Sequence, residues 1–285
     1  MINKSSDWDF VITPNRGWLE INLNEVFNYK DLLWLFVMRD YTTQFKQTIL
    51  GPIWFILQPL IYTIVFTFVF SGVAKISTGD VPPMLFYMSG IIAWNYFSGC
   101  LSETSNVFNR NAGLFSKVYF PRIVVPLSIV ISKLTTFFVQ SVLLLILYFY
   151  YSSNGDLNYH FDYTYLVLLP IMILQMAVLG LGLGSIISSL TVKYRDLGFL
   201  LGFGTQLLMY ACPIVYPLSS VPDKYKFYIE LNPMTPIIIG FRKIFTGEGQ
   251  FSLDVYLFSI FISVFIFLIG FIIFSKVEKK FIDTI

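Results

Sequence analysis

Few residues of this sequence have the types and spacing that catalytic or metal chemistry requires. His160 is the only histidine and lies in a short polar segment, whereas Cys100 and Cys212 lie in apolar stretches. We interpret both cysteines as small buried hydrophobic residues rather than as a disulfide or as metal ligands. The sequence contains neither a GxxxxGK(S/T) phosphate-binding loop nor an HExxH metal motif. We therefore expect no catalytic residue, no metal site and no ATP hydrolysis by this chain.

The composition requires lipid as the solvent for most of the chain. Of its 285 residues, 56% are hydrophobic and 13% are charged, against about 25% charged in soluble domains. The formal net charge of +2, without a Lys/Arg-rich run, argues against nucleic-acid binding. Asp7 and Asp9 occupy the place where the apolar core of a signal peptide would lie. We therefore expect residues 1–28 to form a cytoplasmic N-terminal segment.

Charge-free windows mark the membrane spans, because a charge near the middle of a bilayer costs several kcal/mol. Ile53–Ala74 contains 22 residues, roughly 33 Å of helix, which matches a hydrocarbon core of about 30 Å. Five more windows follow: Val81–Ser102, Leu134–Gly155, Tyr163–Val192, Leu197–Pro222 and Val255–Ser275. We predict an all-α membrane protein whose six transmembrane helices, in a domain from 51 to 285, span about 53–74, 84–106, 123–151, 164–192, 197–217 and 253–275.

The distribution of cations between the segments that join the spans predicts the orientation. With both termini in the cytoplasm, the inner segments hold 14 Lys and Arg residues and the outer segments hold five, as the positive-inside rule requires. We place Lys133 near the cytoplasmic end of the third helix, where its stem can reach the interface. The windows themselves carry no ionisable group, which argues against catalysis or a proton relay at membrane depth.

Residues 29–50 precede the first span and have a different pattern. Apolar side chains recur there at helical spacing, with Arg39, Lys46 and Gln47 between them: Trp34, Met38, Tyr41, Phe45 and Ile49. This pattern predicts an amphipathic helix in the cytoplasmic interface, which Gly51-Pro52 would end. The alternative is a simple extension of the first span.

The cytoplasmic segment 103–122 is longer than a passive connector needs to be. Apolar and aromatic residues lie there outside any predicted span: Leu114, Phe115, Val118, Tyr119 and Phe120. Their display on a short helix would suit docking into a groove of a partner. A segment that rests on the membrane surface is the alternative.

The external segment 217–250 contains an apolar run that is too short to span and is interrupted by Pro233 and Pro236. Broken backbone at membrane depth is tolerated only where protein or a water-filled cavity covers it. We therefore predict re-entrant half-helices that cap a pore on the outer side. Ordinary packing outside the membrane is the alternative.

Several stretches resemble the membrane subunit of ABC-2 type polysaccharide exporters, the permeases that move O-antigen, capsule or teichoic-acid chains. The resemblance runs from about residue 29 to the C-terminus. It rests on RDYTTQFKQTILGPIWFILQPL (39–60), MSGIIAWNYFS (88–98), LFSKVYFPRIVVPL (114–127), KYRDLG (193–198) and NPMTPIIIGFRKI (232–244). The first 28 residues have no counterpart in the family.

The resemblance implies partners and site residues. Two copies of the chain would form a channel in the bacterial inner membrane, and each would contact a cytoplasmic ATPase that binds ATP and Mg²⁺. Contact with the ATPase would fall on a coupling helix and a second loop, at Asn111, Leu114, Phe115, Lys117, Tyr119, Tyr194, Arg195 and Asp196. The periplasmic gate would include Asn232, Pro233, Pro236 and Arg242.

The implied substrate is a glycan on an undecaprenyl diphosphate anchor. Its diphosphate needs cations at headgroup depth, for which Arg39 and Lys46 are candidates; ordinary interfacial anchoring is their alternative role. Aromatic residues make up 19% of the chain, and sugar C–H faces stack on aromatic rings. The candidate pore-lining residues are Tyr62, Phe66, Trp94, Tyr96 and Phe97, which could equally face lipid or the interface.

Other functions remain compatible with this sequence. An ABC-2 permease for teichoic acid, capsule, lipids or drugs would share most of these motifs. A membrane enzyme of glycan assembly would normally have a large outer loop with charged catalytic residues; the outer segments here are modest, although Arg242 and Lys243 keep this alternative open.

Overall fold

The computed structural model describes residues 27–46, 48–115, 117, 118, 120–155, 163–194 and 196–284. These residues form helices joined by turns, and none of them belongs to a β-strand, which confirms the predicted all-α fold. The elements are α2 (Lys30–Phe45), η1 (Gly51–Ile53), α3 (Trp54–Phe66), the π-helix η2 (Thr67–Val73), α4 (Pro83–Ser105), α5 (Val107–Phe115), α6 (Val124–Ser153), α7 (Tyr163–Leu166), α8 (Leu168–Thr191), α9 (Leu197–Ala211), η3 (Leu218–Ser220), α10 (Asp223–Glu230), α11 (Met234–Thr246) and α12 (Leu253–Thr284).

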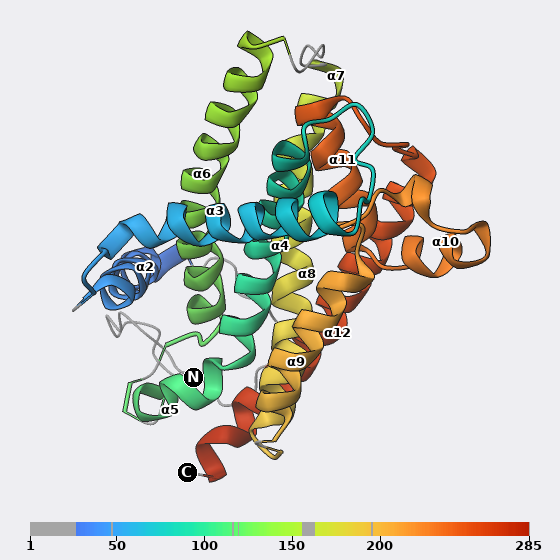
Figure 1. Cartoon of the computed structure of the whole chain (residues 1–285). Coiled ribbons are helices and arrows are strands. Elements are labelled where there is room, and N and C mark those ends of the chain that lie inside the picture. Colours follow the sequence, from blue (N-terminus) through green and yellow to red (C-terminus); the bar gives the residue numbers. More distant parts are fainter. Residues whose placement is uncertain are drawn as a thin grey trace, which may run out of the picture.

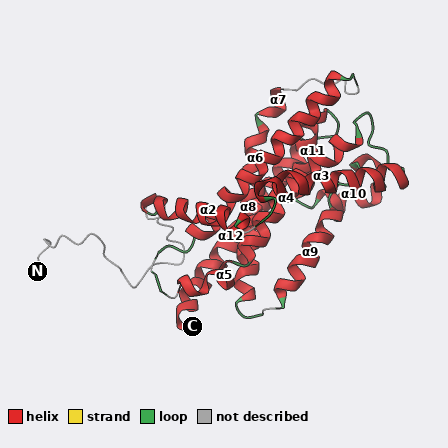
Figure 2. Cartoon of the chain, turned by 60° about the vertical axis from the view of Figure 1, so that its left-hand side comes forward, coloured by secondary structure: helices red, strands yellow, loops and turns green. Residues whose placement is uncertain are grey.

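Helix α4 forms the centre of the bundle. It packs against α8, α6, α11 and α3, and α8 packs in turn against α12. Figure 1 shows α4, α6, α8 and α12 running the length of the molecule, while α3 crosses in front of α6 and α4. Helix α9 stands apart from this bundle in Figure 2 and has no buried residue.

Four helical stretches are long and apolar enough to cross a membrane: Gly51–Val73, Val124–Ser153, Leu168–Thr191 and Leu253–Glu278. The second predicted window falls on α4, whose 23 residues include polar ones such as Ser89 and Asn95. Because most of α4 is buried among other helices, it does not need the apolarity of a lipid-facing span. That all six predicted windows cross the membrane stays a prediction.

The fifth window contains a shorter helix than the one we predicted. Helix α9 ends at Ala211 and has 15 residues, or about 22 Å, which is less than a hydrocarbon core of about 30 Å. The chain then turns at Cys212 and Pro213. This part of the predicted window is uncharged but not helical, so a charge-free stretch does not by itself predict a helix. Both Cys212 and Cys100 are free and buried, as predicted.

Helix α2 occupies most of the predicted range 29–50, but it ends at Phe45 and not at Gly51-Pro52. It is separate from α3, which argues against a simple extension of the first span, and its position in the membrane interface stays a prediction. Phe36 and Val37 are buried, whereas Trp34, Leu35 and Met38 are exposed. Phe36 belongs to a second hydrophobic core with residues of α5, α6 and α12. Gly51, where φ is +51°, lies at the junction with the first span.

Helices α8 and α12 approach so closely that only glycine fits between them. A Cβ atom on Gly270 would lie 2.2 Å from the carbonyl oxygen of Gly182, and one on Gly182 would lie 2.6 Å from Cα of Phe267. Small residues allow this close backbone approach between helices in lipid, where dispersion drives association.

We expect Gly270→Ala to lower the stability of the purified protein by about 1–3 kcal/mol, because the added methyl must push the two backbones apart. Gly202→Ala on α9 is the matched control, since no atom lies within 4 Å of its Cβ position and alanine favours helix. Thermal unfolding in detergent measures both variants. Equal unfolding temperatures for the two would contradict the close packing.

Candidate anion-binding site

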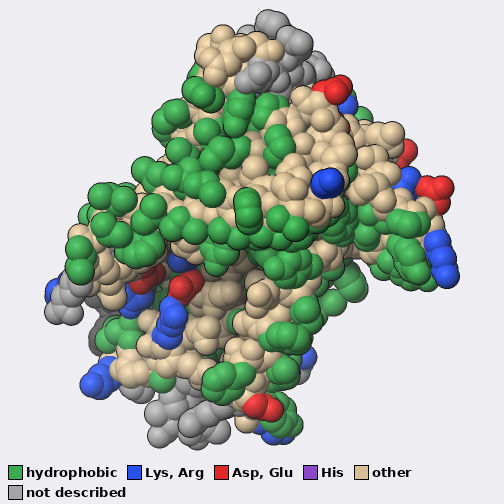
Figure 3. All heavy atoms as spheres, in the orientation of Figure 1, with side chains coloured by type: hydrophobic (Ala, Val, Ile, Leu, Met, Phe, Trp, Pro, Cys, Tyr) green, Lys and Arg blue, Asp and Glu red, His purple; other side chains and the backbone are tan. Residues whose placement is uncertain are grey.

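A cavity of about 450 Å³ opens where α2, α4, α5 and α6 meet. Figure 3 shows it as a hollow below α3 in which acidic and basic side chains gather, on a face that is otherwise largely apolar. Its lining comprises Arg39, Asp40, Thr43, Gln44, Glu103, Arg110, Asn111, Val125, Ile129, Ser132 and Lys133. Segments almost a hundred residues apart in sequence therefore contribute to one charged site.

The helical repeat explains which residues line the cavity. Positions 39, 40, 43 and 44 share one face of α2, and positions 125, 129, 132 and 133 share one face of α6. Phe36, one turn before Arg39, is buried in the second core and anchors α2. The same packing that buries Phe36 therefore turns Arg39 toward the cavity.

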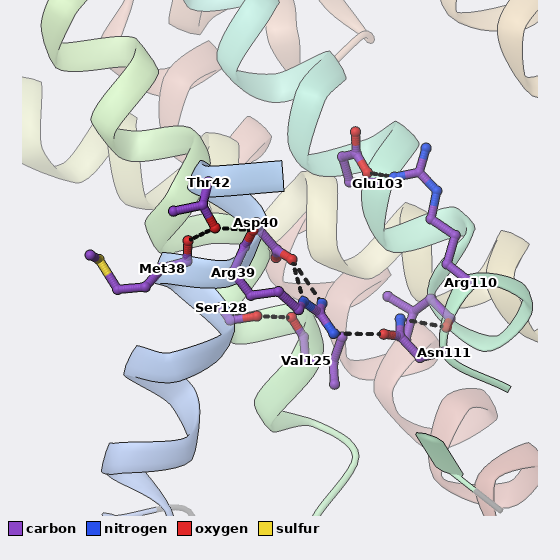
Figure 4. Close-up of polar contacts among 10 residues, drawn as sticks. Met38, Arg39, Asp40, Thr42, Glu103, Arg110, Asn111, Val125 and Ser128 are labelled. Atoms are coloured by element: carbon purple, nitrogen blue, oxygen red, sulfur yellow. Dashed lines mark hydrogen bonds and ion pairs between the residues drawn. The ribbon is translucent and has the colours of Figure 1, made fainter. Parts of the chain in front are cut away.

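Arg39 is held in place by three contacts. Its Nε and Nη2 donate to Oδ1 of Asp40 at 3.0 and 2.7 Å, and its Nη1 donates to Oδ1 of Asn111 at 3.3 Å. The guanidinium carbon also lies 4.7 Å from the ring centroid of Phe36. Figure 4 shows Arg39 extending from α2 toward Asn111 on α5. The guanidinium is thus oriented before any ligand binds.

Glu103 joins the two other cations of the cavity. Its Oε2 accepts a hydrogen bond from Nη1 of Arg110, and its Oε1 lies 3.6 Å from Nζ of Lys133. Lys133 lies inside α6 and further from the helix end than we predicted, and its ion pair with Glu103 partly offsets the cost of burying its charge. The last turn of α4 thereby connects α5 with α6.

The charge of this cavity favours an anion. Three cations face two carboxylates, which leaves one net positive charge among the lining residues. Two guanidinium groups suit phosphate oxygens, because their planar forks donate paired hydrogen bonds. Any anion must compete with Asp40 and Glu103 for these donors.

Of the residues that we predicted to bind the diphosphate or to contact the ATPase, only two line this cavity. Arg39 and Asn111 line the cavity, whereas Lys46 is exposed after the end of α2 and does not line it. Glu103, Arg110 and Lys133 were not predicted as site residues. Because these residues are far apart in sequence, the sequence does not show that they form one site. Their charges near the predicted ends of helices could nevertheless have marked them as candidates.

The prediction that aromatic residues of segment 103–122 are displayed for docking is wrong for Phe115 and Phe120. Both are buried in the second core, where Phe115 also packs on Phe108. Leu114 is partly buried, and Lys117 and Val118 are exposed. The sequence could not separate inward from outward aromatic residues here, because Phe115 is the last residue of the short helix α5 and Phe120 follows it outside any helix.

Of the remaining predicted coupling residues, Tyr194 is half-exposed and Asp196 directly precedes α9. Tyr119 and Arg195 lie outside the described residues, as does His160.

Four of the five predicted pore-lining aromatics are core residues. Phe66, Trp94, Tyr96 and Phe97 are buried in the main hydrophobic core, and Tyr62 is exposed. Tyr96 packs on Phe137 of α6, for example. The central position of α4 explains the burial of Trp94, Tyr96 and Phe97, and Phe66 of α3 is buried because it packs on Tyr87 of α4.

Segment 217–250 contains the short 3-10 helix η3 and two short α-helices, α10 and α11; that these helices re-enter the membrane and cap a pore on the outer side stays a prediction. Asn232 precedes α11, where its Oδ1 accepts from the backbone N–H of Met234 and its Nδ2 donates to Sγ of Cys212. Pro233 is the N-cap of α11, and Pro236 lies in its first turn, where proline is tolerated because those N–H groups need no partner within the helix. Helix α11 is buried over most of its length.

Arg242 is a buried residue of α11 in the same segment. Its Nη2 donates to the carbonyl oxygens of Pro213 and Ile214 at 2.9 and 3.3 Å, and its guanidinium carbon lies 3.5 Å from the ring centroid of Phe86. Burial lowers the pKa of Arg242 to about 9, which leaves it charged at neutral pH, and burial raises the pKa of Glu248, an effect that nearby Arg242 opposes. Arg242 therefore ties α11 to α4 and to the turn after α9.

Comparison with known proteins gives consistent matches over most of the chain. The family described as ABC-2 type transporter matches residues 31–246. The chain is 26% identical over 268 residues to the O-antigen export system permease protein RfbA of Klebsiella pneumoniae, covering 94% of this chain and 98% of that protein. It is 26% identical over 225 residues to RfbA of Myxococcus xanthus (78% and 83% covered). It is 23% identical over 203 residues to the polysialic acid transport protein KpsM of Escherichia coli (70% and 76% covered).

Proposed function

Because this chain belongs to the ABC-2 type transporter family, we propose that it is the transmembrane permease subunit of an ATP-driven exporter of an O-antigen-like polysaccharide. The observation that carries this proposal is the alignment with O-antigen export permeases over nearly their whole length. The four candidate spans place the subunit in a membrane. We propose the bacterial inner membrane, with both termini in the cytoplasm.

Transport by this chain needs an energy source in another subunit, since its sequence has no phosphate-binding loop. We propose two copies of the chain with two copies of a cytoplasmic ATPase that binds ATP and Mg²⁺. The exposed residues around α5, including Lys117, and the segment that contains Tyr194 and Asp196 would contact the ATPase. Helix α5 supplies Arg110 and Asn111 to the cavity, so a contact there would join ATPase and substrate sites.

The cavity is the proposed site for the diphosphate of an undecaprenyl-linked glycan. Arg39 supplies an oriented guanidinium, and Arg110 and Lys133 supply the further charge that a diphosphate requires. Lys46, exposed beyond the end of α2, would interact with lipid headgroups at the membrane surface. The exposed apolar side chains of α2, such as Trp34 and Met38, would hold this helix against the bilayer.

We expect Glu103→Gln to tighten diphosphate binding about three- to tenfold, because a neutral amide competes less well for Arg110 and Lys133. Lys133→Gln should weaken binding by at least as much. Titration of the purified protein in nanodiscs with geranylgeranyl diphosphate measures both. Lys30→Gln, an exposed cation on α2 that does not line the cavity, is the control, and weaker binding by Glu103→Gln would contradict the assignment.

The proposed function itself is tested in cells. The chain is expressed with and without the ATPase encoded beside it, and lipid-linked glycan on each side of the inner membrane is measured. We expect glycan to accumulate inside when either protein is missing. Outward movement without any ATPase would refute the assignment of this chain as a transporter subunit.

Export of a capsule polysaccharide is the second candidate, because the polysialic acid transport protein KpsM also matches, over 70% of the chain. Analysis of the glycan that accumulates in the same cells distinguishes the two. A capsule-type chain in place of an O-antigen-type chain would favour the second candidate.

A further inference from the structure

A second pocket, of about 570 Å³, lies where the segment between η2 and α4 meets the end of α6. Its size is within the range of about 300–1,000 Å³ that small-molecule sites occupy. Figure 1 shows this segment at the same end of the molecule as α7 and α11, whereas α5 lies at the other end. We call it the loop pocket, and its lining comprises Ser71, Lys75, Ile76, Ser77, Thr78, Gly79, Asp80, Val81, Pro82, Pro83 and Tyr151.

Two helices line both the loop pocket and the anion-binding cavity. On α6, Lys133 lines the cavity and Tyr151 lines the loop pocket; they are 18 positions apart, or about 27 Å of helix. On α4, Pro83 and Glu103 are 20 positions apart in the same way, or about 30 Å. The hydrocarbon core of a bilayer is about 30 Å thick. Along the candidate span α6, the two polar sites are therefore separated by about the thickness of a membrane.

The loop pocket offers one ammonium group and one carboxylate that are free to bind a ligand. The side chains of Lys75 and Asp80 line the pocket and form neither a hydrogen bond nor an ion pair with another residue in the described part of the chain. They are the charged residues of the lining, which has no net charge, in contrast to the anion-binding cavity. The loop pocket therefore suits a neutral ligand that both donates and accepts hydrogen bonds.

The backbone that carries these groups is held in place from within and from α11. Lys75 has φ of +54°, a left-handed conformation that is uncommon for a residue with a side chain. Thr78 is buried, and its Oγ1 donates to the carbonyl oxygen of Val81 at 2.8 Å. Gly79 packs directly on the residue pair that follows α11, because a Cβ atom on it would lie 1.8 Å from Oε1 of Glu248. An ordered wall of this kind loses little conformational entropy when a ligand binds.

These groups match the chemistry of a sugar ring. A carboxylate accepts hydrogen bonds from two adjacent hydroxyl groups, and an ammonium group donates to hydroxyl oxygens. Tyr151 adds an aromatic ring, whose hydroxyl donates to Sδ of Met84 at 3.8 Å, and sugar C–H faces stack on such rings. Pro82 and Pro83 add apolar surface to the lining. A sugar is polar at its rim and apolar on its faces, so it can satisfy both kinds of surface.

We propose that the loop pocket is a sugar-binding site, which holds a residue of the exported glycan on the side of the membrane opposite to the anion-binding cavity. Asp80 and Lys75 bind hydroxyl groups of that residue, and Tyr151 contacts a face of its ring. The glycan meets this pocket on the exit side. Its place on the export path rests on the proposed function, whereas the binding of sugar does not.

The test uses a glycan fragment that carries no lipid and no diphosphate. The oligosaccharide that mild acid releases from the surface polysaccharide of the natural host is titrated into the purified protein in nanodiscs, where both faces are accessible. Asp80→Asn should weaken binding about five- to tenfold, because a charge-assisted hydrogen bond is lost, and Lys75→Gln should weaken it comparably. Both variants should unfold at the wild-type temperature, because neither side chain pairs with another described residue.

Two controls separate the loop pocket from other sites. Asp223→Asn removes an exposed carboxylate that does not line the pocket and should leave binding of the oligosaccharide unchanged. Geranylgeranyl diphosphate, the probe of the anion-binding cavity, should not compete with the oligosaccharide. The sugar site is overturned by a wild-type protein that does not bind the oligosaccharide, by equal binding to Asp80→Asn, or by competition from geranylgeranyl diphosphate.

Export by the same variants tests the place of the pocket on the path. At limiting glycan, ATP-dependent export by Asp80→Asn should fall by about the factor by which its oligosaccharide binding falls. Weaker binding with unchanged export would remove the loop pocket from the path. Wild-type protein that shows no ATP-dependent export would refute the proposed function, while the titrations would still decide whether the pocket binds sugar.

Discussion

Arg39→Ala should raise the concentration of lipid-linked glycan needed for half-maximal export by about ten- to a hundredfold, while the protein reaches the membrane in normal amount. A charge-assisted hydrogen bond contributes about 1.5–3 kcal/mol, and each 1.4 kcal/mol is a factor of ten in affinity. Asp40 and Asn111 already orient the guanidinium, so little conformational entropy is lost when it binds the diphosphate. The substitution therefore removes a donor that contributes strongly to binding. Export assayed in membrane vesicles against glycan concentration measures the effect.

Two further variants separate a specific role of Arg39 from a general effect of charge. Arg39→Lys keeps the charge but loses the planar fork, so we expect it to recover part of the affinity. Lys30→Ala removes a cation from the same helix outside the cavity and should leave export unchanged. Normal export by Arg39→Ala at normal expression would remove Arg39 from the proposed site.

Arg242→Met should destabilise the protein by about 3–5 kcal/mol, the cost of breaking a buried charged network from one side. The substitution leaves the carbonyl groups of Pro213 and Ile214 without their donor and Glu248 without the nearby positive charge. In a protein of this size the loss corresponds to a decrease of about 10 °C in the unfolding temperature. Thermal unfolding of the purified protein in detergent measures it.

Lys226→Met is the matched control for Arg242→Met. Lys226 also lies in segment 217–250, but it pairs with Asp223 at an exposed position, where ion pairs contribute little. We expect its unfolding temperature to match that of the wild type. If both variants unfold at the wild-type temperature, Arg242 does not hold the outer helices together.

The helices were predictable because lipid imposes a strong rule on sequence. Charges are excluded from the windows that became α3, α6, α8 and α12, and the structure has long apolar helices there. The same rule extended the fifth window too far, because the turn after Ala211 is uncharged but not helical. Pro213 was a local signal for that break.

The direction in which side chains point was much less predictable. An aromatic residue on a membrane helix is equally compatible with lipid, a channel or a core, and Trp94 and Phe97 proved to lie in the core. The anion-binding cavity depends on how α2, α5 and α6 pack, so Lys133 and Glu103 could not be paired from sequence. Arg39 was identified because the family resemblance implied a substrate with a diphosphate, and Arg39 is a cation on the predicted interfacial helix.

The central claim is that this chain moves a lipid-linked glycan across a membrane with energy from a separate ATPase. Proteoliposomes that hold both proteins, with the ATPase facing outward, test it directly. A labelled lipid-linked glycan is added outside, and its protection from an added glycosidase is followed over time. We predict protection that requires ATP and both proteins; protection without ATP or without the ATPase, or none under any condition, would contradict the account.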